Sequence, residues 1–434
     1  MSKDLLAAFR EAYGNLKLQP LLEPRELERF RVDYGSQVIA DLEQLVEDSP
    51  DGDDKIIFTG HRGCGKSTLL AELKRRFNQR YFVVFFSIAD TIEMSDVNHI
   101  NILFAIAVNL MFEAEKQQIP IPPSSKEAFY KWFATRTRVE SQEVGTQASL
   151  EFPPFPGIKL LELIKLKLQA EAKVREELKQ QFQRRVSDLI ARINEIAAII
   201  YRATSQDVLV IIDDLDKLDL AVAREIYQDN IKALLKPNFR IILTIPISAL
   251  RETKMVAVMN TETNNQIVPM PVSKLFGKGK RCLPDAVPQQ EAKDTLCQIL
   301  TKRIPQELLE PQVAEQIVVK SGGVLRELVR ITNECCRICL RLVRKYPERE
   351  NIKIDQAVLQ EAVNKLRLDF ATPIGTADYQ ILKNTYQNCT PDDPTAQKFL
   401  DLLHGLYVLE YRNSEIWYDI HPIVTDILKE RGIL

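Results

Sequence analysis

The chain has 434 residues, 45% of them hydrophobic and 27% charged, which is ordinary for globular proteins and predicts about two to four domains. The formal net charge of −2 excludes a molecule that attracts nucleic acid or anionic membrane through its overall charge. Apolar runs fall short of the ~20 residues that a bilayer span needs, so we expect no membrane insertion. The start, MSKDLLAAFREAYGNL, is amphipathic and acidic in part, unlike a signal peptide, which predicts a cytoplasmic protein.

Residues 1–54 form a predicted N-terminal helical segment that ends in the turn-forming stretch DSPDGDD. Short apolar runs rich in β-branched and aromatic residues then predict buried strands. These runs are KIIFTG, Tyr81–Asp90, Val208–Asp216, Phe239–Ile247 and, weakened by its prolines, Gln266–Val272. Helical stretches separate them, so we expect an α/β core over residues 55–284, with a parallel sheet and helices on both faces.

The second and third predicted strands are separated by an unusually long gap, about 91–207. It contains the proline-rich stretches IPIPPSS and EFPPFPG, the alternating run IKLLELIKLKL and a long helix-like stretch. We interpret this gap as an insertion, a hairpin plus a long helix, that covers or extends the core.

Two further segments follow the core. Residues 285–370 have helical periodicity throughout, and residues 371–434 predict two helices, a hairpin around the turn RNSE, and a final helix that admits Pro422 near its start. That order is typical of a winged-helix module. Within it we interpret Tyr411, Trp417 and Tyr418 as core and protein-contact residues, and His421 as a capping or packing histidine.

The 7 cysteines have irregular spacing, which argues against a disulfide framework. Cys336 and Cys339 form a C-x-x-C, but no second pair or paired histidine follows at the spacing of a zinc finger. The stretch NECCRICLRL has helical character, so we interpret these cysteines as small buried residues on a helix face.

The stretch GHRGCGKS fits the phosphate-binding pattern G-x-x-x-x-G-K-[ST] and stands between a predicted strand and a predicted helix. Glycines let the backbone wrap a phosphate so that its N–H groups point inward at the start of the helix. We expect Lys66 to meet the β- and γ-phosphates and the Ser67 hydroxyl to ligate Mg²⁺. His61 is interpreted as a variable loop residue that faces solvent or protein as readily as phosphate. The nucleotide-contacting set is therefore Gly60, His61, Arg62, Gly63, Cys64, Gly65, Lys66, Ser67 and Thr68.

The run VLVIIDDLD ends in two acids at the carboxyl edge of a buried strand. Asp213 is predicted to hold Mg²⁺ through water, and Asp214 to orient or deprotonate the attacking water. Asp216 and Asp219 are interpreted as surface acids of the following turn. Two acids after a strand can also belong to a helix N-cap region, but the upstream phosphate loop favours the catalytic interpretation.

Two more polar residues complete the predicted site. Thr244, near the end of its strand, is placed to meet the γ-phosphate or the attacking water, although a hydroxyl satisfying backbone explains it equally well when it is taken alone. Arg326, on the first turn of the helix after SGG, is predicted to reach the phosphates, with a solvated helix arginine as the alternative.

Together these motifs resemble the AAA+ and STAND branches of the ASCE P-loop ATPases, over about residues 31–368. The resemblance implies a sheet in 5-1-4-3-2 order, a helical lid at 285–370 and a winged helix at 371–434. It also implies sensor-1 and sensor-2 roles for Thr244 and Arg326. The Asp213-Asp214 pair departs from the Asp-Glu of AAA+ motors and is closer to STAND and KAP-type ATPases, which predicts slow hydrolysis. No arginine finger is assigned; Arg251 and Arg281 are the nearest candidates.

We therefore expect an ATP- and Mg²⁺-dependent switch that binds ATP or ADP and acts through a protein partner or self-assembly, in signalling or anti-phage defence by analogy with the family. The alternative is a DNA-engaging ATPase (an initiator, loader or transposition regulator) that uses the winged helix. It is not favoured, because acidic residues outnumber basic ones in residues 371–434. A nucleotide-bound scaffold without turnover is the third interpretation.

Overall fold

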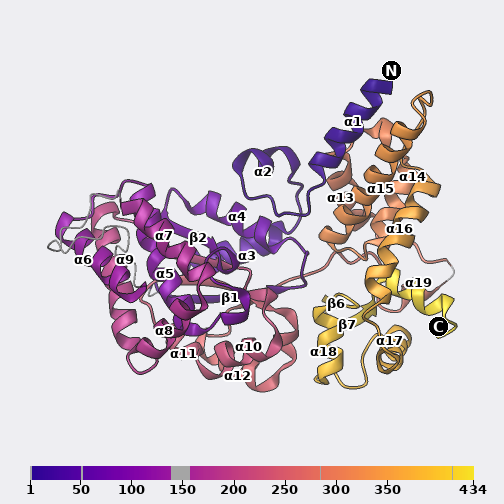
Figure 1. The fold of residues 1–434 in the computed structure, drawn as a ribbon. Helices are drawn as coiled ribbons and strands as arrows, with labels where there is room; N and C mark the ends of the chain where they lie inside the picture. The colour runs from indigo at the N-terminus through magenta and orange to yellow at the C-terminus, as the bar shows by residue number, and fades with distance from the viewer. Residues whose placement is uncertain (1, 50–51, 138–156, 284, 413) are drawn as a thin grey trace. The chain divides into compact units, whose positions relative to one another are not determined.

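The computed structural model describes residues 2–49, 52–137, 157–283, 285–412 and 414–434 (Figure 1). The chain forms two compact units, each built from separate stretches of sequence. Unit 1 contains Met1–Val38, Gly60–Glu72 and Pro269–Leu434, and unit 2 contains Ile39–Thr59 and Leu73–Val268. None of the helices in the described residues combines the length and apolarity that a membrane span requires.

A five-stranded sheet has the order β2-β3-β4-β1-β5, which confirms the predicted P-loop NTPase fold and its strand order. Its strands are β1 Lys55–Gly60, β2 Tyr81–Ser87, β3 Asp207–Asp213, β4 Arg240–Pro246 and β5 Ile267–Met270. β2 and β3 pair in parallel so that Ser87 lies beside Asp213. The interior strands β3 and β4 are apolar and buried because helices cover parallel sheets on both faces. β5, which contains Pro269, is an edge strand, where a missing backbone donor is tolerated.

The insertion is helical in the residues described. It consists of α5 His99–Lys116, α6 Pro123–Thr137, α7 Gly157–Ala170, α8 Ala172–Phe182 and α9 Val186–Thr204. The predicted hairpin is therefore wrong where the alternating run lies, because that run is α7. Leu161, Ile164 and Leu168 are buried at helical spacing, whereas Leu163 and Leu166 are exposed. The predicted long helix breaks between α8 and α9, and most of EFPPFPG lies outside the described residues.

The core of unit 2 combines the sheet with helices from the insertion and from the stretch after β3. α5 is its centre: thirteen of its residues, among them Leu103, Phe104 and Leu110, are buried, as expected for a helix that is apolar around most of its surface. The later helices of the unit are α10 Leu220–Arg224, α11 Ile231–Leu234 and α12 Thr253–Glu262.

Unit 1 contains the helical segment predicted over residues 285–370. Its helices there are α13 Gln290–Thr301, α14 Pro311–Lys320, α15 Leu325–Lys345 and α16 Gln356–Ala371. The N-terminal helix α1 Ser2–Asn15 packs along α15, as Figure 1 shows. Cys335, Cys336 and Cys339 are buried on α15, as small residues of a helix face should be, and burial raises the pKa of Cys336 to about 12.

The chain ends in the predicted order of helix, helix, hairpin and helix. The elements are α17 Thr376–Asn388, α18 Gln397–His404, β6 Val408–Arg412, β7 Ile416–Ile420 and α19 Pro422–Glu430. β6 and β7 pair antiparallel, and Asn413 of the predicted turn lies outside the described residues. Tyr411 and Trp417 stack with ring centroids 4.5 Å apart, and both are buried together with Tyr418.

Candidate functional site

The phosphate-binding loop is the connection between β1, which ends at Gly60, and the helix α4 Lys66–Phe77. Lys66 is buried, and its Nζ donates hydrogen bonds to the carbonyls of Gly60 and His61, each at 2.9 Å. The lysine therefore lies folded back on its own loop. A loop that places a lysine at the N-terminus of a helix has the donors that bind a phosphate group.

α15 contacts this loop directly. The backbone N–H of Arg326 donates to the carbonyl of Gly63 at 2.9 Å. Gly63 has φ +79°, and a Cβ on it would stand 2.4 Å from the Cβ of Arg326, so only glycine fits there. The structure thus places the backbone of Arg326 against the loop, on the first turn of α15 as predicted; a contact of its guanidinium with phosphate stays a prediction.

The loop histidine is buried and faces protein, which was one of the alternatives in its interpretation as a variable loop residue; it does not face solvent. The His61 side chain belongs to a residue only 1% exposed, and its Nε2 accepts a hydrogen bond from the backbone N–H of Glu410 at 2.8 Å. Burial and the charge of Lys66 lower the pKa of His61 to about 3. The ring is therefore neutral at physiological pH.

The other predicted phosphate-binding residues lie along the same loop and helix. Arg62, Gly65 and Ser67 are partly buried, and Cys64 is fully buried. The Thr68 hydroxyl accepts a hydrogen bond from the backbone N–H of Leu21 at 3.1 Å, so it ties the N-terminal segment to α4.

Three acids gather at the end of β3 in unit 2. Oxygens of Asp213, Asp214 and Asp216 all lie within 4.8 Å of one another. Carboxylate oxygens are the ligands that Mg²⁺ prefers, so the donor set fits that cation. Asp216 is buried, which makes the prediction of a surface acid wrong. Asp219 is exposed, as predicted, and its carboxylate caps α10 by accepting the N–H of Val222 at 2.9 Å.

Asp214 is held from both sides. Its backbone has φ +69°, an uncommon conformation for a residue other than glycine. The Ser87 hydroxyl donates to Asp214 Oδ2 at 2.6 Å, and Lys217 Nζ pairs with Asp214 Oδ1 at 2.6 Å. Both carboxylate oxygens therefore have a partner within unit 2.

Thr244 supports the acidic turn. It is fully buried in β4, and its hydroxyl accepts the backbone N–H of Leu215 at 3.0 Å. The sequence left two roles open for this hydroxyl, a hydrogen bond to the backbone and a contact with phosphate. The structure shows the hydrogen bond to the backbone. By holding Leu215, Thr244 fixes the turn that presents Asp214.

Sequence reasoning missed three residues of these sites. Ser87 could have been found by aligning the ends of the parallel strands, since it lies in register with Asp213. Lys217 carried the signal of an (i, i+3) charge pair with Asp214. Glu410 carried none, because its contact with the loop is made by a backbone N–H far away in the sequence.

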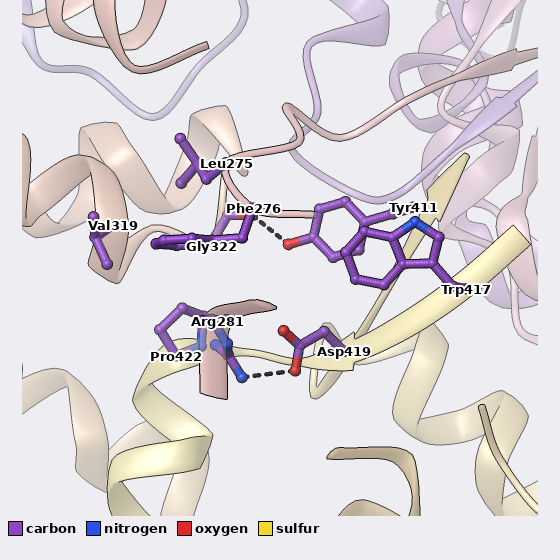
Figure 2. Close-up of a pocket in the computed structure, with 9 residues that line it drawn as sticks. All are labelled: Leu275, Phe276, Arg281, Val319, Gly322, Tyr411, Trp417, Asp419 and Pro422. Carbon is purple, nitrogen blue, oxygen red and sulfur yellow. Dashed lines mark hydrogen bonds and ion pairs between the residues drawn. The ribbon is translucent and has the colours of Figure 1, made fainter. Parts of the chain in front are cut away.

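A small cavity lies beside the hairpin in unit 1 (Figure 2). Tyr411 donates its hydroxyl hydrogen to the carbonyl of Gly322 at 2.9 Å, and Arg281 pairs with Asp419 at 2.7 Å and donates to Thr425. The cavity, of about 10 Å³, holds no more than one water molecule, so it is too small to bind a nucleotide. Arg281, one of the two finger candidates, is thus bound within its own chain.

Comparison with known proteins gives one family match. A model of the KAP family P-loop domain matches residues 36–254, just over half of the chain. The match includes the phosphate-binding loop and the acids after β3. No curated protein sequence matches the chain.

Solved structures with a similar fold have low identity to the chain. Cdc6p from Pyrobaculum aerophilum has 11% identity and a TM-score of 0.43, with 96% of this chain and 98% of that chain covered. Orc1 from Aeropyrum pernix, in complex with DNA, has 12% identity and a TM-score of 0.38, with 95% and 96% covered. RuvB from Thermotoga maritima has 12% identity and a TM-score of 0.39, with 95% and 99% covered. TM-scores below 0.5 carry no inference about what this chain does.

Proposed function

Because the chain belongs to the KAP family of P-loop NTPases, we propose that it is a molecular switch that binds ATP, hydrolyses it slowly with Mg²⁺, and acts through a protein partner or self-assembly. The observation that carries the proposal is the hydrogen bond from Arg326 N–H to the carbonyl of Gly63. It joins a phosphate-binding loop directly to α15. A ligand that reshapes the loop must therefore act on that helix, which is what a switch requires.

The residues of the loop and of the acidic turn have separate tasks in this proposal. Residues 60–68 bind the nucleotide phosphates, with Lys66 as the point charge and Ser67 as a metal ligand. Asp213 supplies a carboxylate for Mg²⁺, and bound Mg²⁺ neutralises charge on the phosphates. Asp214 orients or deprotonates water, and Thr244 positions the turn that carries it.

Slow turnover is supported by the contacts of Asp214. A carboxylate that accepts a proton from water needs an oxygen available to that water. Both oxygens of Asp214 are engaged by Ser87 and Lys217. An ATPase of this kind stays in its nucleotide-bound state for a long time, as a timed switch does.

The same proposal includes a division of the chain into four domains, with boundaries at residues 54, 284 and 370. In it, residues 285–370 act as a helical lid and residues 371–434 as a winged helix. A protein partner is favoured over DNA because residues 371–434 contain more acidic than basic residues. The basic residues there are Lys383, Lys398, Arg412, Lys429 and Arg431, against the acids Asp378, Asp392, Asp393, Asp401, Glu410, Glu415, Asp419, Asp426 and Glu430. Two of those cations are already engaged, Arg412 by Glu410 and Arg431 by Tyr379.

The first test measures ATP binding and phosphate release for the full chain and single variants. We expect Lys66→Ala to weaken ATP binding at least tenfold. Asp214→Asn should keep binding within about threefold and lose at least 90% of phosphate release. Asp219→Asn, an exposed acid of the same segment, is the matched control and should behave like the unmodified chain.

If the unmodified chain releases phosphate no faster than the Lys66→Ala variant, the ATPase is contradicted and the nucleotide-bound scaffold without turnover is supported. If it releases phosphate faster than Lys66→Ala but no faster than Asp214→Asn, the role of Asp214 is contradicted. A gel-shift assay at low salt addresses the DNA alternative. Tight binding with a steep salt dependence would reverse the preference for a protein partner.

A further inference from the structure

His61 joins the phosphate-binding loop to the terminal hairpin, and both belong to unit 1. The backbone N–H of Glu410 donates to His61 Nε2 at 2.8 Å. Glu410 lies opposite Tyr418 in the two-stranded hairpin. Its backbone N–H faces the open edge of β6, where the ring of His61 accepts it. The Glu410 side chain is fully buried and pairs with Arg412 at 2.7 Å, which fixes this part of the strand.

The same hydrogen bond fixes the tautomer of His61. A ring nitrogen that accepts an N–H carries no hydrogen, so a neutral His61 has its proton on Nδ1. Nδ1 is buried, and no acceptor for it exists among the described residues. Leaving a buried donor without an acceptor is unfavourable, so a ligand that offers an acceptor to Nδ1 would be bound more favourably at this position.

Lys66 acts on the same residue from the other side. Its Nζ donates to the carbonyl of His61 at 2.9 Å. Lys66 is the group that the proposed function assigns to the nucleotide phosphates, and its three N–H donors must turn to the phosphate oxygens when nucleotide binds. His61 therefore accepts two hydrogen bonds, one from Lys66 on its backbone carbonyl and one from the β6 backbone on its ring, so it connects Lys66 to β6.

We propose that His61 is a latch that couples nucleotide occupancy of the loop to the terminal hairpin, with nucleotide loosening the hydrogen bond to Glu410. The coupling rests on the proposed nucleotide binding. When Lys66 leaves the His61 carbonyl for the phosphates, the loop backbone at His61 loses its anchor. The buried Nδ1–H then gains a phosphate oxygen as acceptor, and the imidazole moves off β6.

Hydrogen exchange of the full chain, measured by mass spectrometry with and without Mg²⁺ and ADP or a non-hydrolysable ATP analogue, tests this latch. In the unmodified chain we expect nucleotide to accelerate exchange in the peptide that covers β6 at least threefold. His61→Phe keeps a ring but has no acceptor, so its β6 exchange should be fast already and should not respond to nucleotide. His61→Gln retains an acceptor at the position of Nε2 and should restore slow exchange without nucleotide.

Two readouts keep the latch separate from the proposed function and from misfolding. Nucleotide occupancy is measured by titration in the same samples, and the exchange of the α13 peptide, which belongs to the same unit as His61, reports whether unit 1 of each variant is folded. Occupied protein whose β6 exchange does not change, or a His61→Phe variant that responds like the unmodified chain, would overturn the latch and leave nucleotide binding intact. A chain that binds no nucleotide would overturn both.

Discussion

Asp214, the residue proposed to orient the attacking water, combines an uncommon backbone conformation with contacts that restrain both of its carboxylate oxygens. Its backbone has the left-handed conformation, with φ +69°, and the hydroxyl of Thr244 accepts the N–H of the next residue, Leu215. Such strain persists only where neighbours over-determine the conformation. Ser87 and Lys217 then engage the two carboxylate oxygens. Lys217 is the better of the two to substitute, because its side chain is partly exposed and lies three residues further along the chain.

Lys217→Ala should raise the rate of phosphate release about three- to tenfold while leaving KM for ATP within twofold. The substitution frees Oδ1 of Asp214 to accept a proton from water, and it does not touch the loop that binds phosphates. Steady-state phosphate release is the measurement. Lys217→Arg keeps the ion pair and should stay near the original rate, and the gain should vanish in a variant that also carries Asp214→Asn. A slower Lys217→Ala variant would show that the lysine assists the reaction.

At the scale of elements, motifs with a local physical cause were predicted well. The apolar runs gave the sheet, and the phosphate-binding loop was found because its glycines and lysine lie in one short stretch. The insertion was harder to predict. IKLLELIKLKL alternates between apolar and polar residues like a strand, yet Leu161, Ile164 and Leu168 also have helical spacing, and these three residues are the buried ones. Asp216 was mistaken for a surface acid because its burial depends on the turn that Thr244 holds. The contact of His61 with Glu410 joins residues that no sequence pattern connects.

Arg281 ties the segment after β5 to the terminal hairpin and to α19. It pairs with Asp419 at 2.7 Å and donates to Thr425 at 2.9 Å, and both charged side chains are largely buried. Burial raises the pKa of Asp419, and Arg281 opposes that rise. The ion pair therefore compensates a desolvation cost more than it adds attraction.

Arg281→Ala should lower the free energy of unfolding by about 3 kcal/mol, because it leaves the Asp419 carboxylate buried without its cation. Urea unfolding of the full chain measures the loss. The double variant Arg281→Met, Asp419→Leu removes both charges and keeps much of the volume, so it should recover most of the stability. If the double variant is as unstable as Arg281→Ala, the loss comes from packing or from the Thr425 hydrogen bond.

At the scale of the whole molecule, hydrogen bonds within unit 1 connect the phosphate-binding loop to three segments that lie far from it in the sequence. The unit collects the N-terminal helices, the segment Gly60–Glu72, the helices α13–α16 and the terminal hairpin. The loop contacts α15 through Gly63, the hairpin through His61, and the N-terminal segment through Thr68. Any change in loop conformation therefore reaches three parts of the chain through hydrogen bonds.

Two buried histidines make the stability of this unit sensitive to acid. His421 caps α19, since its Nδ1 accepts the N–H of Ile423 at 3.3 Å, and it stacks on Phe370 at 4.8 Å. Burial lowers the pKa of His421, like that of His61, to about 3. The unfolded chain binds a proton on each histidine near pH 6.5, whereas the folded chain does not. The full stability is therefore present above pH 6.5 and declines as the pH falls from there toward 3.

We expect each histidine to reduce the free energy of unfolding by about 2 kcal/mol between pH 7 and pH 5. Urea unfolding followed by the fluorescence of Trp417, which is 2% exposed in the hairpin, measures this; a Trp132→Phe background removes the other tryptophan. His421→Asn retains an oxygen that can cap Ile423 but does not titrate in this range, so it should lose about 2 kcal/mol less over the interval. An identical loss in both proteins would show that His421 is protonated in the folded state, and the acid sensitivity would then rest on other groups.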